Sequence, residues 1–223
     1  MAIGQMEVIR AIRDGLSRDG TALFPMMPYA EFRHMSDEDV YALVAYLRTL
    51  PPVKNVLPRS QINFPVSMFI KSVPKPAGQV PTVDRSNQLK YGEYLTRLGG
   101  CAGCHTPMDK GEPLPGKWLA GGEIFRTPMG TVVSANITPD KDTGIGKWSE
   151  QDFLNKFYQY KKYVETGSPK IGPESFTLMP WLPFYQLPEE DLKAIFAFLK
   201  TQLPVYNAVE THPAHLQPVK PVS

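Results

Sequence analysis

The sequence predicts an all-α protein whose helices are joined by long loops rich in proline and glycine. Three observations lead to this class. Apolar residues recur at helical spacing in several segments. Proline is frequent, at 23 of 223 residues, which disfavours regular sheet. A stretch near the N-terminus recurs near the C-terminus, and both copies end in a helical pattern. We therefore expect one complete helical module preceded by a partial half-module.

The N-terminal segment has the pattern of the inside of a helix, because Met6, Ile9, Ile12 and Leu16 recur near helical spacing. It has no basic start followed by an apolar core, so we expect no signal peptide in this chain. No apolar run approaches the roughly 18 residues of a spanning helix, so we also expect no membrane span. Lys and Arg number 24 against 22 Asp and Glu, which lacks the basic excess of nucleic-acid-binding proteins.

Residues 26–55 align with residues 178–207 at a constant offset and without a gap. More than a third of the positions are identical, including Met27 with Met179 and the proline after each. Each copy ends in a predicted helix with an i, i+3, i+4, i+7 apolar stripe. The stripes are Val40, Leu43, Val44 and Leu47 in the first copy and Leu192, Ile195, Phe196 and Leu199 in the second. In the first copy, Ser36 offers an N-cap hydroxyl.

This repeat sets the expected domain organisation. Residues 1–55 are predicted to be the C-terminal half of a truncated module, and residues 85–210 a complete one. Residues 56–84 between them are predicted to be an extended, semi-rigid proline-rich linker. Residues 211–223 are predicted to be a proline-rich tail. The first helix of the complete module is expected over residues 86–99, directly before a pair of cysteines.

The chemistry of the chain is concentrated in Cys101-Ala-Gly-Cys104-His105, a C-x-x-C-H motif typical of covalent haem attachment. On one helical turn, Cys101 and Cys104 face the same side and can form thioethers with the two vinyl groups of a porphyrin. His105 then comes under the iron as the proximal ligand. A zinc site needs about four ligands, and a thioredoxin-like site needs a preceding strand, so both alternatives are weaker. A chance match is the main competitor, and the Met-Pro repeat argues against it.

An electron carrier needs a sixth iron ligand, and methionine is a soft thioether donor that raises the reduction potential. Met179 is the best candidate, because Pro180 fixes the backbone beside it. The alternative is that Met179 is a core residue that fills space. Other possible ligands lie outside the repeated motif or in the tail: Met108, Met129, His212 and His215.

The loop between the cysteines and the repeat is expected to wall the haem. Gly121-Gly122 can let the backbone approach the ring. Asn136, Thr138 and Trp148 can serve as donors to the haem propionates or pack on its edge. The competing interpretation is a polar loop that caps a helix starting at Ser149 or Glu150.

Taken together, C-A-G-C-H-T-P, A-N-I-T-P-D-x-x-T-G-I-G-x-W and M-P-[YW] resemble the c-type cytochrome subunits of bacterial periplasmic dehydrogenases, such as the multihaem partners of alcohol, gluconate and aldehyde-type dehydrogenases. The resemblance implies a cytochrome c-like fold with one covalently attached haem c. It also implies that Cys101 and Cys104 anchor the haem, and that His105 and Met179 bind the iron.

The function implied by the resemblance is electron transfer from a periplasmic dehydrogenase to a quinone, an oxidase or another cytochrome of the respiratory chain. The location is then the periplasm or the periplasmic face of the membrane. A haem enzyme of the peroxidase or sulfur-compound oxidase type is the alternative, although no nucleophile or acid–base pair stands out. A non-functional truncated fragment is a third possibility.

The resemblance has one departure, at the N-terminus. A haem-binding front is absent before Gly4, so we expect a truncated or mis-started chain in which Met27 is a distal ligand by descent, without an iron. The half-module is then expected to pack against the complete module or to remain partly loose.

Overall fold

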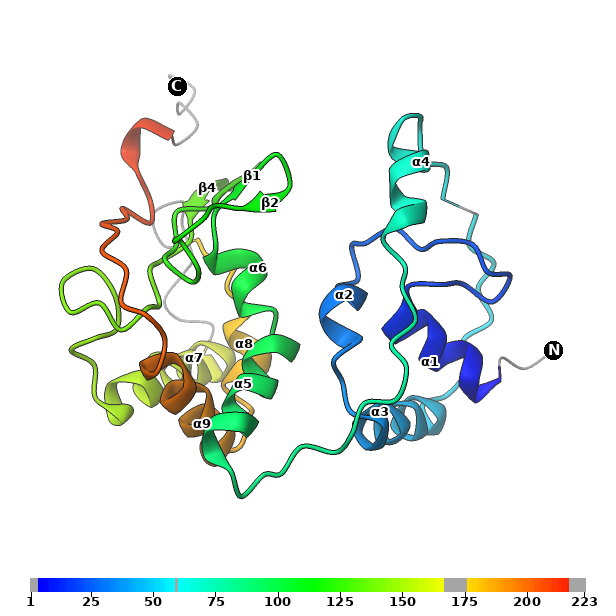
Figure 1. The fold of residues 1–223 in the computed structure, drawn as a ribbon, viewed down its shortest axis with the longest axis horizontal. Coiled ribbons are helices and arrows are strands. Elements are labelled where there is room, and N and C mark those ends of the chain that lie inside the picture. The colour runs from blue at the N-terminus through cyan, green and yellow to red at the C-terminus, as the bar shows by residue number, and fades with distance from the viewer. Residues whose placement is uncertain (1–3, 59, 167–175, 217–223) are drawn as a thin grey trace. The chain divides into compact units, whose positions relative to one another are not determined.

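The computed structural model describes residues 4–58, 60–166 and 176–216. The backbone divides into two compact units, with unit 1 ending at Asp84 and unit 2 beginning at Arg85 (Figure 1). Helices dominate both units and strands are few and short. The predicted all-α class is therefore confirmed.

The described part of unit 1 contains four α-helices and a 3-10 turn. They are α1 (Gln5–Asp14), α2 (Tyr29–Phe32), α3 (Asp37–Thr49) and α4 (Val66–Phe69), which continues into the 3-10 turn η1 (Ile70–Ser72). Helix α1 ends at Gly15, whose φ of 76° is favourable only for glycine. Leu16, expected within this helix, lies beyond its end and pairs with Ala22 in an isolated β-bridge.

The core of unit 1 is small. Tyr29, Val40 and Val44 are fully buried, and Ile9 and Ile12 of α1 pack beside them. The predicted N-cap is confirmed, since Asp39 N donates to Ser36 Oγ over 3.1 Å. Unit 1 therefore has its own hydrophobic core, built from α1, α2 and α3.

The segment expected to be a linker lies within unit 1, and its second part hydrogen-bonds to the helices. Asp37 N donates to Val80 O over 2.9 Å, and Ala77 N donates to Asp14 Oδ1 over 2.8 Å. Residues 66–72 of this segment form α4 and η1, whereas residues 74–84 have no regular secondary structure. In the latter part, the N–H groups of Ala77 and Val80 find partners on α1 and α3. Proline content alone could not distinguish such a docked segment from a free linker.

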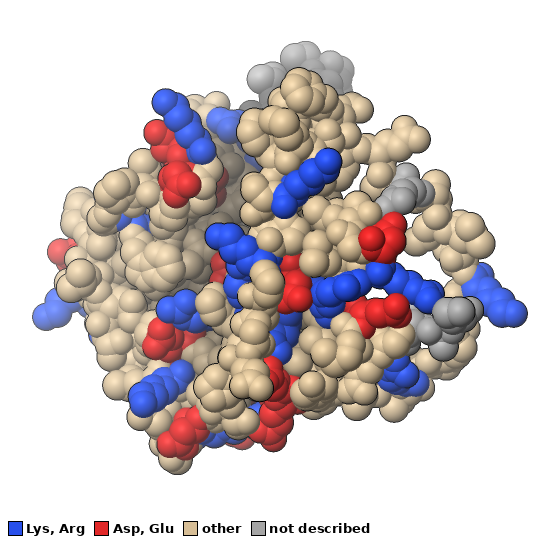
Figure 2. Space-filling view, turned by 45° about the vertical axis from the view of Figure 1, so that its right-hand side comes forward, with Lys and Arg blue, Asp and Glu red and all other residues tan. Residues whose placement is uncertain are grey.

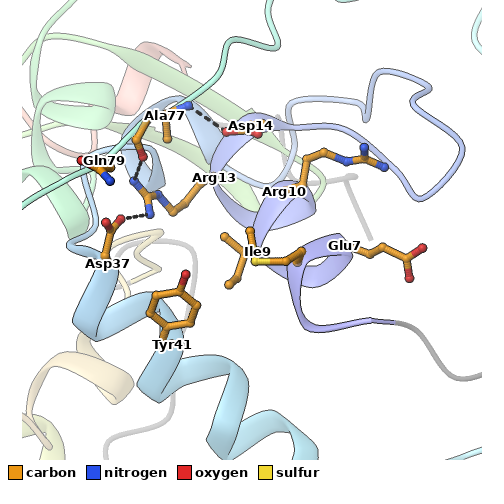
Figure 3. Close-up of a pocket in the computed structure, with 11 residues that line it drawn as sticks. Glu7, Ile9, Arg10, Arg13, Asp14, Asp37, Tyr41, Ala77 and Gln79 are labelled. Atoms are coloured by element: carbon orange, nitrogen blue, oxygen red, sulfur yellow. Dashed lines mark hydrogen bonds and ion pairs between the residues drawn. The ribbon is translucent and has the colours of Figure 1, made fainter.

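Arg13 joins this segment to the helices (Figure 3). Its side chain is only 4% exposed; Nη1 contacts Asp37 Oδ1 at 2.6 Å, and Nη2 donates to Gly78 O over 3.0 Å. The Arg13 guanidinium, together with the N–H of Val80, holds the pKa of Asp37 below its usual range. A cavity of about 410 Å³ opens between α1 and residues 77–79.

Replacing Arg13 by Met should destabilise unit 1 at pH 7, because the Asp37 carboxylate and the Gly78 carbonyl lose their shared partner. The lowered pKa of Asp37 means that this contribution is present above the unfolded pKa of about 3.9 and is lost as the pH falls through the folded value. The difference in the free energy of unfolding of unit 1 between R13M and the wild type should therefore shrink towards pH 3. Hydrogen exchange of α1 and α3 amides at several pH values measures it. Arg18→Met, at an exposed pair with Glu7, is the control.

Unit 2 contains the remaining elements. Its helices are α5 (Gln88–Leu98), α6 (Cys101–His105), α7 (Glu150–Thr166), α8 (Trp181–Phe184) and α9 (Glu189–Lys200), followed by the 3-10 turn η2 (Ala214–Leu216). Two antiparallel ribbons interrupt the loop after α6: β1 (Met108–Asp109) with β2 (Glu112–Pro113), and β3 (Ile124–Thr127) with β4 (Gly130–Val133). In the second ribbon Ile124 lies opposite Val133.

The core of unit 2 lies between α7 and α9, and α5 crosses α9. Its buried members are Leu119, Ile145, Phe153, Leu154, Phe157, Leu192, Ile195, Phe196 and Leu199. All four residues of the predicted α9 stripe are therefore buried. At the crossing, Gly92 of α5 lies so close to α9 that a Cβ there would overlap the Ala194 carbonyl oxygen. Leu89 of α5 lies outside this core and is 48% exposed.

The sequence repeat is also a structural repeat. Pro28 has φ −78° and ψ 57°, and Pro180 has φ −77° and ψ 63°. In both copies the aromatic residue after the proline donates its N–H to the methionine carbonyl over 2.8 Å. Helices α2 and α3 thus correspond to α8 and α9, and α1 corresponds by the same offset to the end of α7. Met27 is half-buried and lies outside the buried core of unit 1.

Candidate haem-binding site

Helix α6 presents both cysteines and the histidine on little more than one turn. Gly100, with φ of 65°, adopts the left-handed conformation that lets the chain leave α5 and start α6. Cys101 and Cys104 are three residues apart, so they share one face, and neither forms a disulfide. Partial desolvation and the charge of Glu123 raise the pKa of the Cys104 thiol. The raised pKa favours the protonated thiol of Cys104.

His105 is held in one orientation. Its Nδ1 donates to Ala135 O over 2.7 Å, which leaves Nε2 as the unprotonated nitrogen available to a metal. Burial lowers the pKa of His105, while the bond to Ala135 acts in the opposite direction. A neutral imidazole with a committed Nδ1 is the form that binds iron.

The backbone around Ala135 is fixed by a second close contact. Gly121 N donates to His105 O over 2.7 Å, and Gly121 has φ of 70°. A Cβ on Gly121 would overlap the backbone of Ala135. In the structure, the lack of a side chain at Gly121 allows its backbone to approach the backbone of Ala135. The sequence did not predict the role of Ala135, because every residue has a backbone carbonyl and the residue type does not show which one accepts the bond.

Asn136 and Thr138 are committed to the protein interior. Asn136 Nδ2 donates to Thr143 Oγ1 over 3.0 Å and to Val205 O over 2.8 Å, and Asn136 Oδ1 accepts from Thr138 N over 2.9 Å. Both residues are buried. These hydrogen bonds fasten the loop that carries Ala135.

The end of this loop caps a helix, as the competing interpretation of the sequence expected. Asp152 N donates to Ser149 Oγ over 3.1 Å, and Ser149 N donates back to Asp152 Oδ2 over 2.9 Å. This reciprocal pair caps the N-terminus of α7. Trp148 is half-buried and packs against the core of unit 2.

Met179 lies at the edge of the core, half-buried, in a backbone that is bonded on both sides. Its N–H donates to Thr177 Oγ1 over 3.1 Å, and its carbonyl accepts from Trp181 N over 2.8 Å. Trp181 Nε1 also donates to Thr177 over 3.3 Å, and its ring stacks on Tyr160 at 4.9 Å. Thr177, the residue just before the repeat, accepts both hydrogen bonds. The sequence did not predict this role.

The other candidate ligands are less suited to the role. Met108 and Met129 are 41% and 56% exposed, in β1 and in the β3–β4 turn. Both ring nitrogens of His212 lie within hydrogen-bond distance of the chain, Nε2 at 2.6 Å from Phe176 O and Nδ1 at 3.1 Å from Thr211 Oγ1. His215 is exposed in η2. Residues 211–216 dock on β4 through Val133 N and Thr131 Oγ1, and the rest of the expected tail is outside the described residues.

The donor set fits haem c. It comprises two cysteines on one face, neither of them in a disulfide, an oriented histidine next to them and a thioether at the core edge. A Cβ at Gly103, between the two cysteines in the chain, would have no neighbour within 4 Å. Within the described ranges, no three His, Cys, Asp or Glu residues gather into a metal-binding group, which leaves the zinc alternative without support.

Comparisons with known proteins agree with this chemistry. Residues 89–202 match the family described as "Cytochrome c". The chain is 32% identical to the fructose dehydrogenase cytochrome subunit of Gluconobacter japonicus over 203 residues, which is 86% of this chain and 40% of that protein. It is 40% identical to the gluconate 2-dehydrogenase cytochrome c subunit of Pantoea cypripedii over 117 residues, 52% of this chain and 24% of that protein.

A third relative is a diheme cytochrome c-type protein of Cereibacter sphaeroides, 31% identical over 198 residues, covering 85% of this chain and 62% of the relative. The chain thus spans less than two thirds of the length of these relatives. The family match covers α5 to α9, including the C-x-x-C-H helix and the Met-Pro turn. The chain therefore belongs to the cytochrome c family, and its cofactor is covalently bound haem c.

Proposed function

We propose that this chain carries electrons from a periplasmic dehydrogenase towards the respiratory chain, through one haem c held by Cys101, Cys104, His105 and Met179. The observation that supports this most directly is the hydrogen bond from His105 Nδ1 to Ala135 O, on a helix that also carries two cysteines outside any disulfide. This combination prepares a covalently anchored group with an imidazole on its iron.

Each residue has a distinct part in this proposal. The thiols of Cys101 and Cys104 fix the haem by thioether bonds, and His105 Nε2 fills the proximal position. Met179 fills the distal one, held by Thr177 and Trp181. When bound, haem supplies one-electron redox chemistry. A filled sixth position excludes substrate and small molecules from the iron, which favours an electron carrier over a haem enzyme.

The partners follow from the relatives' names. Those relatives are cytochrome subunits of fructose and gluconate dehydrogenases, so a dehydrogenase is the proposed electron donor. A quinone, an oxidase or another cytochrome is the proposed acceptor, and the periplasm or the periplasmic face of the membrane is the proposed location. No helix within the described ranges is long and apolar enough to cross a bilayer. On the face drawn in Figure 2, basic and acidic side chains are interspersed, unlike a nucleic-acid-binding surface.

Carbon monoxide distinguishes the two functional classes. Added to the reduced, haem-loaded chain, it should leave the visible spectrum unchanged, because Met179 keeps the sixth position. A charge-transfer band from methionine sulfur to iron should be present in the oxidised protein. Rapid formation of a carbon monoxide adduct by the wild-type chain at neutral pH would contradict the proposal and indicate an exchangeable ligand, as in a haem enzyme. Acid-unfolded protein, in which the ligand is released, serves as the positive control.

A further inference from the structure

The described residues after α9 lie along unit 2 instead of leaving it (Figure 1, orange to red). We define residues 205–212 as the strap. Val205, Asn207, Val209 and Thr211 of the strap are half-buried, whereas the residues between them are exposed. This alternation is that of an extended segment with one side against the protein. The strap can therefore support other parts of unit 2.

The first part of the strap supports the proximal side of the haem site. Asn207 Nδ2 donates to Gly121 O over 3.2 Å, and Gly121 N donates to His105 O over 2.7 Å. Two residues earlier in the strap, Val205 O accepts from Asn136 Nδ2 over 2.8 Å. Asn136 directly follows the residue whose carbonyl orients the His105 ring. The strap thus holds the loop that fixes the proposed proximal ligand.

The end of the strap reaches the segment that carries Met179. His212 Nε2 lies 2.6 Å from Phe176 O, and a carbonyl can only accept, so Nε2 is the donor. In the neutral ring Nδ1 is then the acceptor, and Thr211 Oγ1 donates to it over 3.1 Å. Each ring nitrogen has its own partner, so the imidazole is held in one orientation.

His212 acts from a fixed part of the chain. Just before it, Thr211 O accepts from Val133 N of β4 over 2.9 Å. Beyond it, Leu216 O accepts from Thr131 Oγ1 over 2.8 Å. These two bonds lie on either side of His212 in the chain, so its ring is anchored to the β3–β4 ribbon and not to a free end.

The connection continues from Phe176 to Met179 through Thr177. Thr177 Oγ1 accepts from Met179 N over 3.1 Å and from Trp181 Nε1 over 3.3 Å. Met179 O accepts from Trp181 N over 2.8 Å, which completes the turn. Because Thr177 directly follows Phe176, a movement of Phe176 displaces the acceptor of the Met179 N–H.

Unit 1 shows that the Met-Pro turn forms without these two side chains. At the offset of the repeat, Thr177 and His212 correspond to Pro25 and Ser60. The turn around Met27 nevertheless has nearly the same proline dihedrals and the same N–H to carbonyl bond. Thr177 and His212 therefore serve a purpose other than shaping the turn, and they occur in the unit that has the C-x-x-C-H motif.

We propose that His212 is a positioning residue for the distal iron ligand. By holding Phe176, it keeps the segment around Met179 closed and slows the release of the methionine sulfur from the iron. Opening this segment requires breaking the bond to His212, which leaves a polar group on each side without its partner. This inference rests on the proposed role of Met179 as the sixth ligand, and it adds a residue that controls how long that ligand stays bound.

Replacement of the sulfur by imidazole tests the proposal on the oxidised, haem-loaded chain at neutral pH. Imidazole can bind only after the sulfur has left, so at saturating imidazole the rate at which the charge-transfer band disappears measures opening. His212→Leu should raise this rate about twofold to tenfold, the factor that corresponds to one net hydrogen bond. The band before mixing should be unchanged, because Met179 is still present.

Two further variants separate the hydrogen bond from the bulk of the ring. His212→Gln keeps a side-chain N–H donor at similar reach and should restore a rate close to that of the wild type. Thr177→Val removes the hydroxyl at constant size, and it should raise the rate as His212→Leu does. His215→Leu, a replacement of an exposed histidine three residues later, is the control and should leave the rate unchanged.

The proposal is wrong if His212→Leu and the wild type exchange at the same rate, or if His215→Leu raises the rate equally. It is also wrong if His212→Gln fails to restore the rate or if Thr177→Val has no effect. A wild-type chain without a charge-transfer band would contradict the ligand role of Met179, and this inference with it. The band is recorded before imidazole is added, so failure of the proposed function is distinguished from failure of the inference alone.

Discussion

Replacing Met179 by Ala should lower the reduction potential of the haem and abolish the methionine-to-iron charge-transfer band. The shift should be a sizeable fraction of the roughly 0.8 V over which axial ligands set haem potentials. The physical reason is that a thioether stabilises the ferrous state relative to water or hydroxide. The same variant should bind carbon monoxide when reduced. Redox titration and visible spectra of the purified chain measure both effects.

Unit 1 supplies a matched control for this variant. Met27 sits in the same turn as Met179, with the same proline conformation and the same N–H to carbonyl bond. The two replacements therefore make equal changes in equal local structures. Met27→Ala should leave the potential and the band unchanged, because the chain has one C-x-x-C-H motif and it lies in unit 2. A band that survives M179A but disappears in Met108→Ala or Met129→Ala would assign the ligand elsewhere.

The features that the sequence predicted well depend on residues close together in the chain. The stripe of α9, the N-cap at Ser36 and the C-x-x-C-H helix each follow from local spacing or local hydrogen bonds. The two Met-Pro turns also follow from local sequence, since the two similar stretches adopt the same backbone conformation.

The features that it missed depend on distant contacts. Leu47 has the same place in its stripe as Leu199, yet it is exposed, because burial depends on a second helix that unit 1 does not contain among its described residues. The orientation of His105 depends on a carbonyl thirty residues later. The sequence offered Asn136 as a hydrogen-bond donor to the haem propionates. In the structure its side-chain amide donates to Val205 O, which lies far along the chain. Composition and periodicity carry no information on such pairings.

The crossing of α5 and α9 gives the second large expected effect, on stability. Gly92→Ala should destabilise unit 2, although alanine is the better helix former by about 1 kcal/mol. The added Cβ would overlap the Ala194 carbonyl oxygen, which belongs to the backbone and cannot move aside like a flexible side chain. Forcing the helices apart costs about 1–3 kcal/mol or more in a packed core, so overpacking outweighs propensity. Gly92→Val should cost more again.

Thermal unfolding of the haem-loaded chain, followed at the charge-transfer band, reports on this crossing, because Met179, just before α8, packs against the core to which α9 contributes. Glu93→Ala is the matched control: it is the next residue on α5 and pairs with Arg97 at the surface, a contact worth only about 0.2–0.5 kcal/mol. Equal midpoints for G92A and E93A would show that the helices can separate without cost. A lower midpoint for G92A alone, with hydrogen exchange in α1 and α3 unchanged, would show that the tight crossing stabilises unit 2 independently of unit 1.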